Sequence, residues 1–271
     1  MQAITSREYK MMLQAAKFVG DEDQLREAAS SLWRDLAGSI LLSALAVSGT
    51  DEVERKRRKV CFLDTADKGL RRRDYVVRER LDLDDEEREV TLKFRHPDRY
   101  ISQDRDMKPA KDFSEDMKFE EDIKPRFQAL YSFSSSVLVK PDTKLETLED
   151  VHSLFPGLAK AVEDVPESAP LAIVGGFTGY ERVIRGTTFQ IGKDPDVFAE
   201  CSLTLWYAEE RGEEPLVAEF SFKYEDEKEG YTAAMARRAY DAFLALQDKL
   251  DEWIDTESKT KTAYVYAQAA G

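Results

Sequence analysis

The stretch Glu89-Val90-Thr91-Leu92-Lys93-Phe94-Arg95 alternates polar and apolar residues without a break. Because successive side chains of a β-strand point to opposite faces, this alternation predicts a strand with three apolar residues on one face and two cations on the other. A strand of this kind usually turns its charged face toward bulk solvent. The alternative is that the charges face one another across a cavity, and the neighbouring sequence bears on this choice.

The strand predicted just before this stretch, residues 75–81, places Arg78 and Arg80 on one face. A short acidic connection joins the two strands as an antiparallel hairpin, which brings these arginines next to Lys93 and Arg95. Four like charges on one side of a hairpin are unfavourable unless anions or acids lie opposite them. We therefore expect the hairpin to form one wall of a site for negative charge.

Composition predicts a folded protein with an acidic body. The 271 residues are 42% hydrophobic and include 14 Phe and 11 Tyr, while the net charge is −14. Such a charge argues against DNA or an anionic membrane as partner, although it is compatible with a local basic pocket. Cys61 and Cys201 lie in apolar alternating runs, which favours buried thiols over a disulfide. The start of the chain resembles no targeting segment and the apolar run 40–47 is too short to span a bilayer, so we expect a cytoplasmic protein.

The rest of the chain contains further strand-like segments, and about eight of all the predicted strands place charged residues on one face and apolar residues on the other; two segments have helical spacing. The other predicted strands cover residues 4–13, 60–65, 116–123, 127–139, 172–174, 180–191, 198–208 and 215–224, and the helices cover 23–48 and 231–254. We expect one domain over residues 1–254, with the first helix inserted after the first strand, followed by a tail at 255–271. The basic run 55–59 is either a solvated helix end or an anion-facing entry to the next strand.

These patterns predict an α+β protein built on a closed, antiparallel, eight-stranded β-barrel. Its apolar face would point outward and be covered by the long amphipathic helices, and its charged face would line a wet tunnel. The candidate residues for this lumen are the cations Lys10, Arg78, Arg80, Lys93, Arg95 and Arg182 and the acids Glu8, Glu120, Asp122, Glu200 and Glu219. The acids could hold Mg²⁺ or Mn²⁺, and the cations could bind a polyanion such as a triphosphate and neutralise its charge.

Several of these segments resemble the CYTH superfamily, the triphosphate tunnel metalloenzymes. The run 62–70, with the sequence FLDTADKGL, is followed by Val77-Arg78-Glu79-Arg80 and by Val90-Thr91-Leu92-Lys93, in the order and spacing of that family's signature. Weaker matches are Ser6-Arg7-Glu8-Tyr9-Lys10, where the family has an ExExK strand, and Ala218-Glu219-Phe220-Ser221, where it has a late ExE strand.

The resemblance implies an eight-stranded tunnel that hydrolyses a triphosphate with a divalent metal. In that picture Lys10, Arg78, Arg80 and Lys93 act on the reacting phosphates, Arg58, Arg95, Arg182, Arg185 and Lys223 bind the substrate, and Glu8, Glu120, Asp122, Glu200 and Glu219 serve the metal. This chain departs from the family at Ser6, Thr204 and Ser221, each of which stands where the family has an acid. Few protein ligands hold such an ion to begin with, so these changes thin the predicted metal site.

Three hypotheses follow for the charged residues. The first is a metal-dependent triphosphatase acting on a triphosphate-containing small molecule or a polyphosphate, and hydrolysis is favoured over cyclisation because no adenine pocket is recognisable. The second is a binding module that keeps its cations, has lost its metal ligands, and holds a phosphate or another organic anion. The third is that the cations form structural ion pairs with acids of the lumen. The sequence identifies neither the substrate nor the oligomeric state.

Overall fold

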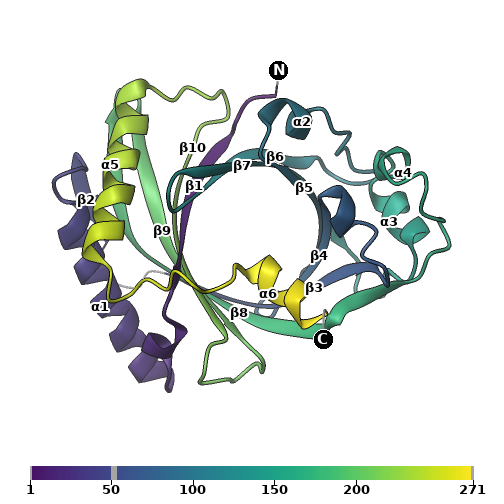
Figure 1. Ribbon diagram of the computed structural model, residues 1–271, viewed down its shortest axis with the longest axis horizontal. Coiled ribbons are helices and arrows are strands. Elements are labelled where there is room, and N and C mark those ends of the chain that lie inside the picture. Colours follow the sequence, from purple (N-terminus) through teal and green to yellow (C-terminus); the bar gives the residue numbers. More distant parts are fainter. Residues whose placement is uncertain (1, 50–53, 270–271) are drawn as a thin grey trace.

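A ring of β-strands forms the centre of the computed structural model, which describes residues 2–49 and 54–269 (Figure 1). The strands are β1 (Ser6–Leu13), β2 (Ala46–Ser48), β3 (Glu54–Thr65), β4 (Tyr75–Asp82), β5 (Arg88–His96), β6 (Asp116–Lys124), β7 (Gln128–Val139), β8 (Leu171–Lys193), β9 (Asp196–Tyr207) and β10 (Val217–Glu225). Nine of them are hydrogen-bonded in the order β8-β3-β4-β5-β7-β6-β1-β10-β9, and β9 pairs with β8 to close the barrel. The short strand β2 pairs with β8 beside this ring.

The predicted barrel is confirmed, but its strand count and its uniform antiparallel pairing are wrong. Strands β1 and β6 run parallel, with Ser6 opposite Glu120 and Tyr9 opposite Ile123, while the other pairs are antiparallel. Strand β8 spans 23 residues, takes in both segments predicted at 172–174 and 180–191, and pairs with β3, β9 and β2. A parallel pair between strands more than one hundred residues apart leaves no trace in local alternation, so the sequence could not show it.

Two long helices cover one side of the barrel, α1 (Glu22–Ile40) and α5 (Ala233–Lys249). They contact each other and pack outside β1, β9 and β10, where a hydrophobic core includes Tyr9, Met11 and Phe243 (Figure 1). Helix α1 begins at a capping box formed by Asp21 and Gln24. Both helices are shorter than predicted, since α1 ends at Ile40 and the predicted residues 46–48 form β2 instead.

A second core fills the opposite outer side, beneath the short helices α3 (Leu148–Leu154) and α4 (Leu158–Ala161). Val90, Leu92 and Phe94 of β5 are buried in this core, as the alternation of that strand predicts. Helix α2 (Arg99–Gln103) follows β5 and contacts β7. The apolar side of β5 packs under helices that lie outside the ring (Figure 1). Its charged side therefore faces away from those helices.

The C-terminal helix α6 (Lys261–Gln268) lies against β8 beside the opening of the ring (Figure 1). Val265 and Tyr266 are buried in a third core with Phe62 and Trp206, and the Tyr266 hydroxyl donates to Asp64 Oδ2 at 2.9 Å. The carboxylate of Asp64 also accepts three backbone N–H bonds from the turn that follows β3. The segment predicted only as a tail therefore contains a packed helix. In the described part of the chain, no helix has the length and apolar character to cross a bilayer.

Candidate functional site

Charged side chains of the inner face form two ion-pair clusters, where the inner face is the side of the barrel strands opposite the covering helices. We call them the Asp122 cluster (Glu8, Lys10, Lys93, Arg95, Glu120 and Asp122) and the Glu181 cluster (Arg58, Arg78, Arg80, Glu89 and Glu181). Both link strands that are not neighbours in the sheet, since β5 contacts β6 across β7 and β8 contacts β4 across β3. Such bridges require the side chains to project from one common face.

Asp122 is the centre of the first cluster, and its side chain is only 1% exposed. It lies 3.0 Å from Lys10 Nζ and 2.7 Å from Arg95 Nη2, and the Ser132 hydroxyl donates to it at 3.3 Å. Lys10 also contacts Glu8 at 2.8 Å. In the same cluster Lys93 donates to Glu120 at 3.2 Å. Every predicted cation of this cluster therefore has a carboxylate partner.

Burial and charge act in opposite directions on the titration of this cluster. Burial by itself would raise the pKa of Asp122, but Lys10, Arg95 and Lys93 hold it well below its ordinary value. Burial would also lower the pKa of Lys10, yet Asp122 and Glu8 raise it above the ordinary value. For Lys93 burial prevails and lowers the pKa in spite of Glu120. Asp122 and Lys10 thus stabilise each other's ionised form in spite of their burial.

The second cluster contains three arginines and two acids. Arg58 donates to Glu181 Oε1 at 3.1 Å, and Arg80 lies 3.7 Å from the same oxygen. Glu89 is more distant from its partners, at 3.7 Å from Arg78 and 4.0 Å from Arg80. The arginines of this cluster therefore outnumber its carboxylates, and two of the three make only loose ion pairs.

The excess positive charge is concentrated at Arg78. Burial and the nearby Arg80 lower its pKa to about 9, although Glu89 and Glu181 act in the opposite direction. Because a guanidinium keeps its proton in proteins, this lowering means that its charge is poorly compensated. Within the described residues, the buried Nε atoms of Arg78 and Arg80 have no hydrogen-bond partner. The cluster therefore has both the charge and the free donors to accept an anion.

The four cations of the β4–β5 hairpin share one face, as predicted, but none of them lies directly opposite another. Arg78 lies opposite Thr91 and Arg80 opposite Glu89, while Lys93 lies opposite Val76. Arg80 contacts Glu181 and Arg78 contacts Glu89, whereas the two cations of β5 contact the acids of β6. Because of this register, no two cations of the hairpin are directly opposite each other. The cations of β4 and those of β5 each contact different acids.

The remaining predicted residues lie at several places. Arg182 lies on the outer face, where it contacts Glu22 of α1 at 3.1 Å and covers the Tyr207 ring, so its predicted position in the lumen is wrong. Strand alternation accounts for this, since its neighbour Glu181 takes the inner position. The other predicted residues lie on the neighbouring strands β8, β9 and β10. Lys223 lies opposite Glu8 and Glu200, Arg185 lies opposite Ser202, and Glu219 lies opposite Thr204. Lys223 contacts Glu225 at 2.6 Å.

The predicted acids do not fit a divalent metal site. Among the described residues, no group of three or more Asp, Glu, His or Cys side chains is placed to hold an ion. Four of the five predicted ligands are instead bound to cations, including Glu219, which lies 2.9 Å from Lys261. Mg²⁺ and Mn²⁺ need several free oxygen ligands, and these carboxylates already neutralise ammonium or guanidinium groups. We therefore derive no chemical step through a metal.

Four residues of the site were not among the candidates, namely Glu181, Trp206, Glu89 and Lys261. The alternation of 89–95 placed Glu89 on the face of Lys93 and Arg95, but gave no reason to count it among the acids of the site. Glu181 and Arg182 are adjacent and both charged, so the alternation of their strand does not show which one points inward. Lys261 lies in a segment without strong periodicity, and no signal marked it.

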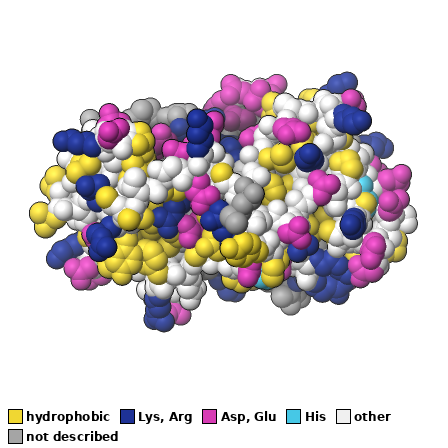
Figure 2. All heavy atoms as spheres, turned by 90° about the horizontal axis from the view of Figure 1, so that it is seen from above, with side chains coloured by type: hydrophobic (Ala, Val, Ile, Leu, Met, Phe, Trp, Pro, Cys, Tyr) yellow, Lys and Arg dark blue, Asp and Glu magenta, His cyan; other side chains and the backbone are white. Residues whose placement is uncertain are grey.

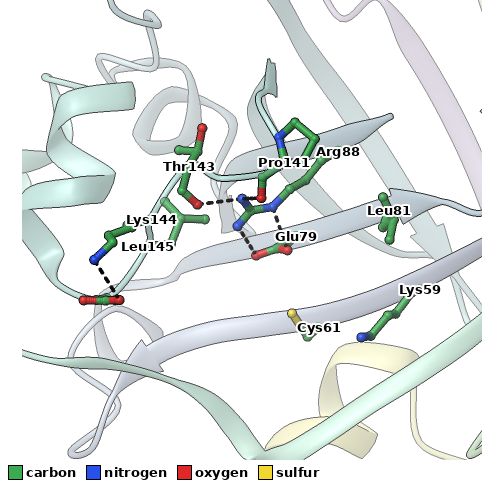
Figure 3. A pocket seen from close by; sticks show the side chains of 10 residues that line it. Lys59, Cys61, Glu79, Leu81, Arg88, Pro141, Thr143, Lys144 and Leu145 are labelled. Carbon is green, nitrogen blue, oxygen red and sulfur yellow. Dashed lines mark hydrogen bonds and ion pairs between the residues drawn. The ribbon is translucent and has the colours of Figure 1, made fainter. Parts of the chain in front are cut away.

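A separate pocket of about 500 Å³ lies outside the barrel, between strands β3 and β4 and the segment 141–146 (Figure 3). Arg88 crosses it, donating to both carboxylate oxygens of Glu79 and to the backbone carbonyl of Thr143. Cys61 borders this pocket and is half-buried, whereas Cys201 is fully buried, and both thiols are free. None of the predicted site residues lines the pocket, and the guanidinium of Arg88 already has hydrogen-bond partners within the protein. We therefore place the candidate site on the inner face.

No family model and no curated protein matches this chain. Solved structures similar to it include a proposed adenylyl cyclase from Hippeastrum, described as having a dominant triphosphatase activity, with 12% identity, a TM-score of 0.49, and coverage of 97% of this chain and 95% of that one. A proposed adenylate cyclase from Bacillus halodurans has 13% identity and a TM-score of 0.41, with 95% of both chains covered. Another from Vibrio parahaemolyticus has 11% identity and a TM-score of 0.36, covering 96% of this chain and 97% of that one.

Proposed function

We propose that the inner face of the barrel lines a charged lumen that binds a triphosphate-containing small molecule or a polyphosphate. The observation that carries the proposal is the uncompensated charge of the Glu181 cluster, in which three arginines share two carboxylates. Arginine suits phosphate recognition because its planar fork can donate two parallel hydrogen bonds to phosphate oxygens. The CYTH-like segments of the sequence support the same class of ligand.

The loosely held acid of the cluster gives the anion a place to bind. Glu89 is 32% exposed and contacts Arg78 and Arg80 only at 3.7 and 4.0 Å. A phosphoryl group that takes the place of this carboxylate would lie beside both guanidiniums. Exchanging one anion for another avoids the cost of leaving the arginines without a counter-charge.

Calorimetric titration with inorganic triphosphate in the presence of EDTA tests the proposal. Removing the charge in Arg78→Gln should weaken binding roughly tenfold or more, because a charged hydrogen bond contributes about 1.5–3 kcal/mol. Arg57→Gln is the matched control, since Arg57 precedes Arg58 on β3 but is 53% exposed and pairs with Asp84 outside the ring. Absence of binding to the wild-type protein, or equal loss in both variants, would contradict the proposal.

Binding without a metal requirement is the form of the function that we propose. Hydrolysis with Mg²⁺ or Mn²⁺ is implied by the sequence resemblance, but the carboxylates that it needs are paired with lysine and arginine. Phosphate release from triphosphate, measured with and without Mn²⁺, separates the two forms. We expect binding with no release in either condition. Metal-dependent release that is lost in Glu8→Ala would establish the triphosphatase instead.

A further inference from the structure

The Glu181 cluster is built around a carboxylate that the proposed function does not explain. Glu181 is 1% exposed and is surrounded by four donors. Arg58 donates to Oε1 at 3.1 Å and Trp206 Nε1 donates to Oε2 at 3.0 Å, while Arg80 and Lys261 approach to 3.7 and 4.0 Å. A negative charge is therefore already present among the groups that would bind an anionic ligand.

This carboxylate is fixed in position. Its two short contacts hold different oxygens, and they come from different strands, Arg58 on β3 and Trp206 on β9. Rotation of Glu181 away from the arginines would leave the buried indole N–H without its acceptor, which is unfavourable. Although burial would raise the pKa of Glu181, Arg80, Lys261 and Arg58 hold it below the ordinary value, so the group stays ionised.

The second acid of the cluster behaves differently. Glu89 is 32% exposed and its ion pairs with Arg78 and Arg80 are 3.7 and 4.0 Å long. It accepts one close hydrogen bond, from Thr91 at 3.1 Å. A ligand can thus displace Glu89, whereas Glu181 remains beside the bound anion.

We propose that Glu181 is a specificity-determining residue, a fixed negative charge that limits how many charges the anion in this site can carry. This inference rests on the proposed function. Each additional charge on the ligand is repelled by the same carboxylate, and the repulsion is strengthened because Glu181 itself is shielded from water. Glu181 therefore disfavours a highly charged triphosphate more than it disfavours a single phosphate.

The test compares orthophosphate, pyrophosphate and triphosphate by calorimetry in EDTA, in the wild-type protein and in Glu181→Gln. The amide keeps an oxygen acceptor for Trp206 but removes the charge. We expect Glu181→Gln to tighten triphosphate binding roughly tenfold and orthophosphate binding less than about threefold, because repulsion scales with ligand charge. Glu89→Gln is the matched control and should tighten all three ligands by a similar factor, because it removes only a displaceable competitor.

The outcomes of this test separate the inference from the function. Equal tightening of the three ligands in Glu181→Gln, or no tightening, overturns the inference while anion binding by the wild-type protein still stands. Absence of any anion binding in the wild-type protein and in both variants overturns the proposed function together with the inference. Should Glu181→Gln not fold, as judged by circular dichroism, Arg58→Gln/Glu181→Gln replaces the ion pair with two amides. The same dependence on ligand charge, with a smaller gain, is then expected.

Discussion

Asp122 is a buried charge that holds two cations of the inner face. It is 1% exposed and compensates both Lys10 and Arg95. Asp122→Asn keeps the shape of the side chain but leaves Arg95 without its close carboxylate and leaves Lys10 with Glu8 alone. Breaking a buried ion pair from one side is strongly destabilising, so we expect the free energy of unfolding in urea to fall by about 3 kcal/mol or more.

An exposed pair provides the control for this substitution. Arg57 and Asp84 are 53% and 43% exposed, and solvent screens such pairs. Asp84→Asn should therefore change the free energy of unfolding by less than about 1 kcal/mol. Equal losses in the two variants would mean that the ion pairs of the inner face are no more important for stability than those of the surface.

The lowered pKa of Asp122 predicts how the stability of the protein depends on pH. Lys10, Arg95 and Lys93 lower the pKa of Asp122 despite its burial, so its stabilising contribution is complete above the ordinary value of 3.8 and is lost as the pH falls through the lower folded pKa. The stability gap between the wild-type protein and Asp122→Asn should stay constant from pH 7 to about pH 4 and shrink below it. Urea unfolding over this range measures the gap. A gap that shrinks already near neutral pH would contradict the assignment.

For a single residue, the sequence predicts which face of a strand its side chain occupies only where one face of that strand is clearly apolar and the other clearly polar. In 89–95 the apolar residues can only be the buried side, and the inward direction of Lys93 and Arg95 followed from that. At Glu181 and Arg182 both phases present a charge, so the prediction chose the wrong one. Only the pairing of β8 with its neighbours settles it, because Arg182 lies opposite Leu205, which is buried under the outer helices.

The attachment of helix α6 to the barrel leads to a prediction about the local stability of this helix. The hydroxyl of Tyr266 joins this helix to Asp64, and the ring is buried. Tyr266→Phe keeps the ring but removes a bond worth about 1 kcal/mol, so amide hydrogens of residues 261–268 should exchange roughly fivefold faster. Tyr264→Phe is the control, since the Tyr264 ring packs on Phe177 and the substitution keeps that contact. Equal exchange in the two variants would show that the hydroxyl does not hold the helix.

The helices show which elements the local sequence pattern can predict and which it cannot. Helices α1 and α5 were recognised because their apolar stripes are long and continuous, and only their ends were misplaced. Helix α6 has eight residues, several of them small or polar, and it is held by contacts with β3 and β8 that lie far away in the sequence. Its position is a tertiary property, and isolated helices of this length are unstable in water.

For the whole molecule, the charge of the surface and the charge of the inner face have to be considered separately. The chain carries −14 overall, and acidic and basic side chains are interspersed over the face drawn in Figure 2. The composition correctly indicated an acidic body but could not show how its charges pair. Closure of the barrel brings Arg78, Arg80 and Glu181 together from two strands that are separated by about a hundred residues in sequence.

This separation of charge predicts an unusual effect of salt on the rate of anion binding. An anion approaching a body of charge −14 is repelled at long range, and it is attracted only when it is close to the Glu181 cluster. The screening length is about 30 Å at 0.01 M salt and about 8 Å at 0.15 M, so added salt removes the long-range repulsion more than the short-range attraction. The association rate constant for triphosphate should therefore rise severalfold between these concentrations, in contrast to a binding surface that is basic overall.

Stopped-flow tryptophan fluorescence can measure this rate, because Trp206 donates to Glu181 within the cluster. The other two tryptophans, Trp33 and Trp253, are buried in the outer core under α1 and α5, so Trp206→Phe should abolish the signal and serves as the control. A rate constant that falls with salt would show that the field of the inner face extends beyond the mouth of the barrel and dominates the approach. A rise locates the attraction inside the ring, where the uncompensated arginines are.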